Sequence, residues 1–202
     1  MTAFVNHDNK IIFVHTPKTG GTSITDCMVG LDQIHKAAQI FGIDTPNVEY
    51  IESGHATTTE LRNKYPCYDS YFSFAVMREP FSWLMSLFKY RHYRDILSDA
   101  IPTPYSSFDL FIKEFYNINE SLQSHWFTVD GKIDVNEVLD FDDLQSEMTK
   151  RFALKRPLRK INVGKKMTCG YTTKARIDNA TKLLEPDLKL YEKLFGKRWQ
   201  PC

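Results

Sequence analysis

The 202-residue chain contains no apolar run close to the length of about 18 residues that a membrane-spanning helix requires. Residues 1–10 are polar and hold no apolar core of a signal peptide. A strong charge of one sign is also absent: 26 Lys and Arg stand against 25 Asp and Glu, and a net charge of +1 argues against a dedicated nucleic-acid binder. We therefore expect a soluble, cytoplasmic protein with no membrane span and no nucleic-acid partner.

Cysteine is scarce, and its spacing fits no metal site. Cys27, Cys67, Cys169 and Cys202 are too far apart to match a zinc pattern. A chain of this length buries its core without disulfides, so we expect four reduced thiols in a reducing compartment. Internal repeats are absent as well, and the length suits a single domain over residues 1–202.

What the sequence does contain is an alternation of predicted strands and helices. Residues 10–15 form a short apolar, β-branched run, which predicts a strand. Apolar residues then recur at helical spacing, with Thr22 or Ser23 as the expected N-cap. Residues 71–77 predict a second buried strand, followed by a helix with Pro80 in its first turn. Strands that alternate with helices indicate an α/β fold with a central parallel sheet flanked by helices.

Capping and spacing signals predict the remaining elements. Thr57 and Glu60 have the spacing of a capping box, which predicts a helix that begins just after His55. The other expected elements are a loop at 97–107, a helix from Phe108, a short strand within 135–141, a helix at 144–152, a basic irregular segment at 155–173, and helices at 174–184 and 187–195 ended by Gly196.

The segment between the first strand and its helix has the composition of an anion-binding loop. Its glycine pair, Gly20 and Gly21, allows backbone N–H groups to approach an anion at the positive end of a helix. Lys18 adds a mobile positive charge, and three hydroxyl side chains add further donors. A plain strand–helix turn needs none of these groups, so the composition favours an anion site.

The sequence of the same loop does not match the standard Walker A site for a nucleoside triphosphate. The Walker A pattern places lysine directly after the last glycine, followed by Ser or Thr, whereas Lys18 precedes both glycines. The second strand ends in Arg78 and not in an acidic residue that could hold Mg²⁺. This arrangement indicates an anion held by protein cations, with no metal required.

Two motifs together resemble those of a known family. Residues 15–24 are similar to the 5′-phosphosulfate-binding loop of sulfotransferases that use 3′-phosphoadenosine 5′-phosphosulfate (PAPS), in the form found in carbohydrate sulfotransferases. Residues 74–80, with Ser86 eight positions after Arg78, resemble their 3′-phosphate-binding motif, with Glu79 in place of the usual aspartate. Residues 139–144 and 160–166 resemble later family segments, the second without the strict Arg-Lys-Gly form of cytosolic small-molecule sulfotransferases.

The resemblance implies a P-loop-like sulfotransferase fold that binds PAPS as sulfuryl donor and releases the bisphosphate PAP. The residues it implies in nucleotide binding are Pro17, Lys18, Thr19, Gly20, Gly21, Thr22, Ser23, Arg78, Ser86, Lys165 and Lys166. Lys18 would stabilise the leaving phosphate, because the matching family lysine lies beside that oxygen.

His55 is the predicted base. It stands in a turn at a helix entrance, its side chain has a suitable intrinsic pKa, and Gly54-His55 resembles the segment with the catalytic histidine of uronyl 2-O-sulfotransferases. The alternatives are a turn histidine bonded to the backbone, with Glu52 or Glu60 as the base. His15 is expected to be structural, because it ends the first strand.

Two further residues are candidates for acceptor binding. His125 precedes Trp126, and Arg91 lies in a segment that mixes aromatic and cationic side chains, which suits sugar rings. We predict sulfuryl transfer to a hydroxyl-bearing acceptor, a carbohydrate in particular. A small-molecule kinase with a degenerate phosphate loop and a non-catalytic nucleotide-binding module are the alternatives. Acceptor identity and oligomeric state stay open.

Overall fold

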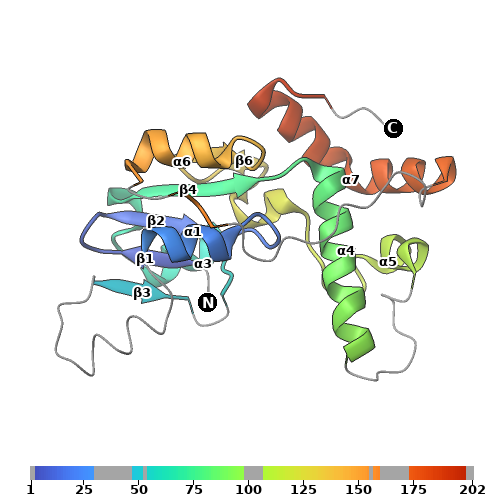
Figure 1. Cartoon of the computed structure of the whole chain (residues 1–202), viewed down its shortest axis with the longest axis horizontal. Helices are drawn as coiled ribbons and strands as arrows, with labels where there is room; N and C mark the ends of the chain where they lie inside the picture. Colours follow the sequence, from blue (N-terminus) through green and yellow to red (C-terminus); the bar gives the residue numbers. More distant parts are fainter. Residues whose placement is uncertain are drawn as a thin grey trace. The chain divides into compact units, whose positions relative to one another are not determined.

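The computed structural model describes residues 3–29, 47–51, 54–97, 107–154, 157–159 and 173–198. Contacts within the chain group it, drawn in Figure 1, into two compact units. Each unit has its own hydrophobic core. The first unit comprises Met1–Met77 and His125–Asn162, and the second comprises Arg78–Ser124 and Val163–Cys202.

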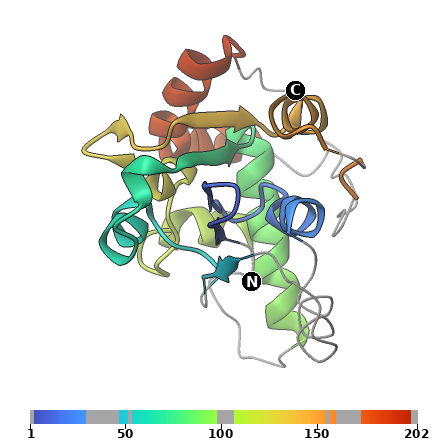
Figure 2. The same ribbon diagram turned by 90° about the vertical axis from the view of Figure 1, so that its left-hand side faces the viewer.

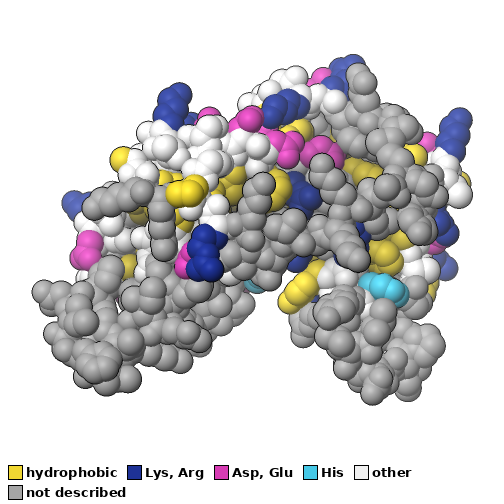
Figure 3. All heavy atoms as spheres, viewed as in Figure 1, with side chains coloured by type: hydrophobic (Ala, Val, Ile, Leu, Met, Phe, Trp, Pro, Cys, Tyr) yellow, Lys and Arg dark blue, Asp and Glu magenta, His cyan; other side chains and the backbone are white. Residues whose placement is uncertain are grey.

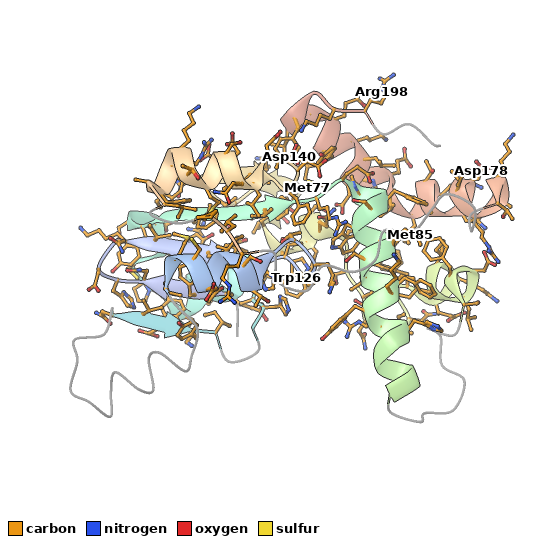
Figure 4. All side chains as sticks on the ribbon, in the orientation of Figure 1. Met77, Met85, Trp126, Asp140, Asp178 and Arg198 are labelled. Carbon is orange, nitrogen blue, oxygen red and sulfur yellow. The ribbon has the colours of Figure 1, made fainter. Side chains whose placement is uncertain are left out.

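A five-stranded sheet in the order β3-β1-β2-β4-β7 forms the centre of the first unit. Its strands are β1 (Phe4–Asn6), β2 (Ile11–Val14), β3 (Val48–Tyr50), β4 (Phe72–Met77) and β7 (Glu137–Asp140). The β2–β4 and β4–β7 pairs are parallel, whereas β1 is antiparallel to both of its neighbours. Every strand except β1 therefore points the same way. Met77 and Asp140 are paired where β4 and β7 end, and they mark the carboxyl edge of the sheet (Figure 4).

Helices cover both faces of this sheet. Helices α1 (Gly21–Met28) and α6 (Leu144–Phe152) lie on one side and α3 (Thr58–Lys64) lies on the other (Figure 2). The fully buried rings of Phe13 and Phe74 stack with centroids 5.0 Å apart in the core beneath α1 and α6. The predicted fold class, a central parallel sheet flanked by helices, is confirmed, with β1 as an antiparallel strand.

Two strands of the sheet were not expected from the sequence. β1 and β3 have three residues each, which is too short to show a two-residue alternation in the sequence. Pairing with β2 makes β1 a strand, and all three of its side chains are buried. The first unit also contains the 3₁₀ helix η1 (Tyr68–Ser70) and a small hairpin of β5 (Thr128–Val129) and β6 (Lys132–Ile133).

Helix capping is as predicted for α3 but not for α1. The Thr57 hydroxyl accepts from the Glu60 N–H at 3.2 Å, and the Glu60 carboxylate accepts from the Thr57 N–H at 2.7 Å, which confirms the capping box. The prediction that Thr22 or Ser23 caps α1 is wrong, because the helix begins at Gly21 with Gly20 as its N-cap. Gly20 has a left-handed backbone with φ 84°, a conformation that glycine adopts readily. The helix therefore begins before the residues that were expected to cap it with a hydroxyl group.

In its described residues, the second unit contains the α-helices α4 (Pro80–Leu97), α5 (Phe108–Glu114) and α7 (Lys174–Phe195). Trp83, Phe111 and Phe115 are fully buried and pack together with residues of α7 such as Ala180. Pro80 is the first residue of α4, as the sequence predicted. A further 3₁₀ helix, η2 (Gln123–Trp126), contains the point where the chain passes from the second unit to the first.

The two closing helices predicted at 174–184 and 187–195 are one continuous helix, α7. The prediction of a break was wrong because Pro186 is tolerated inside the helix. Proline in a helix interior costs about 3 kcal/mol, and burial of Ala180, Leu184 and Tyr191 on one face of α7 opposes that loss. Gly196 ends α7 in the left-handed conformation, as predicted.

The surface seen in Figure 3 mixes charges of both signs over α6 and α7, in line with the net charge of +1. On α7, Lys189 pairs with Glu185, and Arg198 just beyond the helix pairs with Glu192. Among the helices of the described ranges, none combines the length and apolar character needed to cross a membrane. Cys27 and Cys67 are thiols, whereas Cys169, Cys202 and most of the predicted loop and basic segment lie outside the described residues.

Candidate active site

The glycine loop follows β2 and leads into α1. Lys18 is half-buried and has a positive φ of 65°. The buried Thr19 hydroxyl donates to the Thr16 carbonyl at 2.7 Å, so this side chain closes the loop. Ser23 and Ile24 donate their N–H groups to the Gly20 carbonyl at 2.9 and 3.1 Å, which starts the helix. The positive end of α1 is thus presented where the loop ends.

Neighbouring side chains leave no room for a Cβ atom at Gly21 and little at Gly20. A Cβ atom on Gly20 would meet the Phe141 ring at 3.3 Å and would be strained by the left-handed backbone. A Cβ atom on Gly21 would lie 2.1 Å from Nε2 of His15, a distance at which atoms overlap. The glycine at position 21 therefore leaves the space that the His15 ring occupies.

His15 is buried and contacts the turn that contains His55. The two imidazole rings stack with centroids 4.3 Å apart and planes 23° apart. His15 Nδ1 donates to the Gly54 carbonyl at 3.2 Å. Burial, and after it the neighbouring His55, lower the pKa of His15 from 6.5 to about 3. His15 is therefore neutral at physiological pH, in agreement with the structural role expected of it.

The hydrogen bonds of His55 assign its tautomer. Its Nδ1 donates to the His15 carbonyl at 3.0 Å, which places the proton of the neutral ring on Nδ1 and the lone pair on Nε2. The Trp126 ring lies beside the His55 ring at a centroid distance of 5.5 Å. His55 is half-buried and can accept a proton at Nε2, the arrangement that a general base requires.

The alternative carboxylate bases have different surroundings. Glu60 accepts from both the N–H and the hydroxyl of Thr57 at 2.7 and 2.9 Å, and so serves the α3 capping box. Glu52 lies outside the described residues. Across the described ranges, no group of three or more His, Cys, Asp and Glu side chains is placed to hold a metal ion.

In the second unit, Arg78 immediately follows β4 and precedes α4. Its Nε donates to the Ser82 hydroxyl at 3.0 Å. The Glu79 carboxylate accepts from the N–H groups of Phe81 and Ser82 at 2.8 and 2.7 Å, so glutamate caps this helix as a shorter aspartate can. Helical spacing places Ser86 one turn beyond Ser82, on the same side of α4.

Sequence reasoning missed several partners of these groups. Gln123 bonds both peptide groups of Arg78, and Ser82 bonds its side chain. The charge of Arg78, after burial, lowers the pKa of Lys89, so Lys89 is a second cation near the arginine. Helical spacing from Arg78 could have identified Ser82, but no sequence signal pointed to Gln123 or to Trp126 as a neighbour of His55.

The other predicted residues belong to different units or lie outside the described residues. Arg91 belongs to the second unit, where its Nε lies 2.5 Å from Oε1 of the buried Glu120. His125 is exposed in the first unit and meets Trp126 edge-on at 5.6 Å. Lys165 and Lys166 lie outside the described residues. Lys18, His15 and His55 are brought together in the first unit, whereas Arg78 and Ser86 belong to the second.

The mostly parallel sheet, the glycine loop at the start of α1 and the arginine after the neighbouring strand are the features of a P-loop-like α/β protein. A family model described as "Sulfotransferase family" matches residues 1–191, and the chain belongs to this family. No curated protein and no solved structure matches the chain.

Membership of the family confirms the predicted sulfotransferase activity class. Its members transfer a sulfuryl group, in general from PAPS, to a hydroxyl acceptor. The match extends through the glycine loop, the Arg78 motif and most of α7. The small-molecule kinase alternative is set aside, because the family transfers sulfuryl and not phosphoryl groups.

Proposed function

We propose that this chain is a single sulfotransferase domain over residues 1–202 that sulfates a carbohydrate hydroxyl, with His55 as general base. The observation that carries the proposal is the bond from His55 Nδ1 to the His15 carbonyl, which leaves the lone pair on Nε2. In this role, His55 takes the acceptor proton at Nε2 while the acceptor oxygen forms its bond to sulfur. Glu60 is a weaker candidate because its carboxylate caps α3.

Lys18 and the start of α1 have the charge needed at the leaving group. PAPS supplies the sulfuryl group, and breaking its sulfur–oxygen bond returns an electron pair to the 5′-phosphate. Lys18 and the first-turn N–H groups of α1 are proposed to hold that negative charge. Pro17 and Thr19 to Ser23 shape the loop around it. Arg78 and Ser86 are proposed to bind the 3′-phosphate, with Lys165 and Lys166 as further nucleotide contacts.

The neutral state of His15 supports the proton transfer to His55. Two imidazolium rings with centroids 4.3 Å apart would repel each other strongly. Because burial holds the pKa of His15 at about 3, His55 can become charged without a charged neighbour in the stack. His15 thus provides a carbonyl acceptor for Nδ1 and a neutral surface for the ring.

A carbohydrate acceptor is supported by the aromatic surface beside the base. Trp126 lies 5.5 Å from the His55 ring, and the exposed His125 contacts Trp126 edge-on. An indole next to a proton acceptor suits a sugar, whose ring presents an apolar face and whose edge presents hydroxyl groups. Arg91 is proposed as a further acceptor contact for an acidic sugar.

Transfer of ³⁵S from labelled PAPS to a panel of glycans, phenols and small alcohols, in EDTA, tests the proposal. We expect labelled glycan with the wild-type protein and a rate about 10²–10⁴-fold lower with His55→Ala. His7→Gln is the matched control. His7 follows β1 where β2 begins, at the end of the sheet away from the glycine loop, and it bonds Tyr71 and Glu49. Labelling of phenols alone would refute the carbohydrate acceptor. PAP binding without transfer to any acceptor would indicate a non-catalytic module.

A further inference from the structure

Gln123 holds the main chain of Arg78 through both of its peptide groups. The Arg78 N–H donates to Gln123 Oε1 at 2.9 Å, and Gln123 Nε2 donates to the Arg78 carbonyl at 2.9 Å. The side-chain amide thus pairs with Arg78 as a neighbouring strand would. Gln123 has an exposed fraction of 0 %, so water does not compete for these bonds.

Asp187 in turn holds Gln123. The Gln123 N–H donates to Asp187 Oδ2 at 2.8 Å, and the Ser124 N–H donates to Oδ1 at 3.1 Å. Asp187 belongs to α7 and also has an exposed fraction of 0 %. Burial raises the pKa of Asp187, whereas the donors from Ser124 and Gln123 act in the opposite direction. A buried carboxylate is unfavourable without such donors, so these bonds fix the position of η2.

The guanidinium of Arg78 is oriented as well, by the bond from Nε to Ser82. Arginine recognises a phosphate by presenting a planar fork, and the strength of that contact depends on how firmly the fork is held. A main chain fixed by Gln123 and a side chain oriented by Ser82 reduce the ordering that binding requires.

We propose that Gln123 and Asp187 are positioning residues for Arg78, and that through them α7 sets the preference of the protein for a 3′-phosphorylated nucleotide. The inference rests on the proposed role of Arg78 in 3′-phosphate binding. Neither residue contacts the nucleotide. Asp187 fixes Gln123, Gln123 fixes the Arg78 main chain, and the fork of Arg78 is thereby presented in one orientation.

The decisive quantity is the ratio of the dissociation constants of adenosine 5′-phosphate and PAP, measured by calorimetry on the full chain. This ratio isolates the 3′-phosphate, because both nucleotides share the adenosine and the 5′-phosphate. Arg78→Ala should lower the ratio about 10- to 100-fold. Gln123→Glu, which replaces the donor Nε2 by an oxygen, and Asp187→Asn should each lower it about tenfold. Gln145→Glu on α6 is the control for added charge, and it should leave the ratio unchanged.

The outcomes separate the inference from the function on which it rests. If Arg78→Ala leaves the ratio unchanged, the proposed 3′-phosphate site is wrong. If Arg78→Ala lowers the ratio but Gln123→Glu and Asp187→Asn do not, the site stands and the positioning role is refuted. An equal loss of affinity for both nucleotides also refutes it, since a purely structural defect would have that effect.

Hydrogen exchange in the unliganded wild-type protein tests the same claim without a substitution, in case the variants fail to fold. The Arg78 amide should exchange as slowly as the amides in the middle of β4, and PAP should slow it little further. Exchange of the Arg78 amide at the rate of an open loop, with protection only after PAP binds, would contradict positioning before binding.

Discussion

The two units hold their proposed anion-binding groups in different ways. In the first unit, the loop is shaped by its own residues: two glycines, the Thr19 hydroxyl and the start of α1 lie within a few consecutive positions. In the second unit, Arg78 is held by Gln123, 45 residues away in the sequence, and Gln123 is held by Asp187, a further 64 residues away. A local motif defines the first arrangement, whereas only the tertiary structure assembles the second.

The two units also differ in the kind of ionisable side chain that each buries near its proposed functional group. The first unit buries a neutral base, His15, against the turn of the proposed catalytic residue. The second unit buries an acid, Asp187, beneath the segment that holds Arg78. In both cases a buried ionisable side chain fixes backbone near a proposed functional group.

The largest expected effect separates Lys18 from His55 in the first unit. Lys18→Ala should lower turnover about 10²–10³-fold and weaken PAP binding, because the lysine is proposed to contact the phosphate in the ground state. His55→Ala should lower turnover about 10²–10⁴-fold and leave PAP affinity nearly intact, because its Nε2 is proposed to face the acceptor and not the nucleotide. Single-turnover kinetics and PAP titration of both variants test this. A His55→Ala protein with near-normal turnover would sink the assignment.

Gly21→Ala should be the most damaging small substitution for stability. Its Cβ atom would overlap the buried His15 ring, so we expect a loss of about 3 kcal/mol in the free energy of unfolding. Gly131→Ala is the control, because a Cβ there meets no atom within 4 Å and only the positive φ opposes it, by about 1 kcal/mol. Denaturant titrations measure both. If His15→Ala does not relieve the Gly21→Ala defect, the overlap is not its cause.

As pH falls, the contributions of His15 and Asp187 to the free energy of unfolding should change in opposite directions. The pKa of His15 is lower in the folded state, so the unfolded state binds the additional proton between about pH 6.5 and 3. His15 should therefore lower the free energy of unfolding by up to about 1.4 kcal/mol for each unit that pH falls in this window.

Asp187 has a raised pKa, so its protonation favours the folded state, and its contribution should increase as pH falls through that raised value. Unfolding curves of His15→Gln and Asp187→Asn against pH test both signs. The dependence should become shallower below pH 6.5 in His15→Gln and steeper in Asp187→Asn. The same pH profile in all three proteins would contradict the two assignments.

The smallest expected effect concerns the cap of α4. Glu79→Ala should lower stability by about 1 kcal/mol, because the N–H groups of Phe81 and Ser82 lose their acceptor. Glu79→Asp should be nearly neutral, since a shorter carboxylate can still accept from the same groups. Thermal unfolding distinguishes the two. A large loss in Glu79→Asp would show that the longer side chain has a role beyond capping.

The sequence predicted those parts of the fold and site that depend on neighbouring residues. β2, β4, the α3 capping box, the full extent of α6 and the start of α4 at Pro80 were all accessible in this way. The strand β1, with three residues, was not, because pairing with β2 and burial make it a strand. The continuity of α7 through Pro186 likewise depends on packing by Ala180 and Leu184.

The candidate site likewise contains residues that the sequence predicted and partners that it did not. Lys18, the glycine pair, Arg78 and His55 were identified from short motifs, but the partners that orient them were not. The stack of His15 on His55 joins positions 40 residues apart, and the Trp126 contact joins positions still further apart. Sequence spacing has no information about such pairs, since only the folded chain brings them together.

The most direct test of sulfotransferase function needs no acceptor. Thermal unfolding is measured in EDTA with PAP, and in a parallel experiment with ATP and Mg²⁺. A ligand at 100 times its dissociation constant stabilises the folded state by about 2.7 kcal/mol, so bound PAP should raise the melting temperature by several degrees without metal. We predict that PAP does so and that ATP with Mg²⁺ has little effect. Stabilisation by ATP and Mg²⁺ alone would contradict the account.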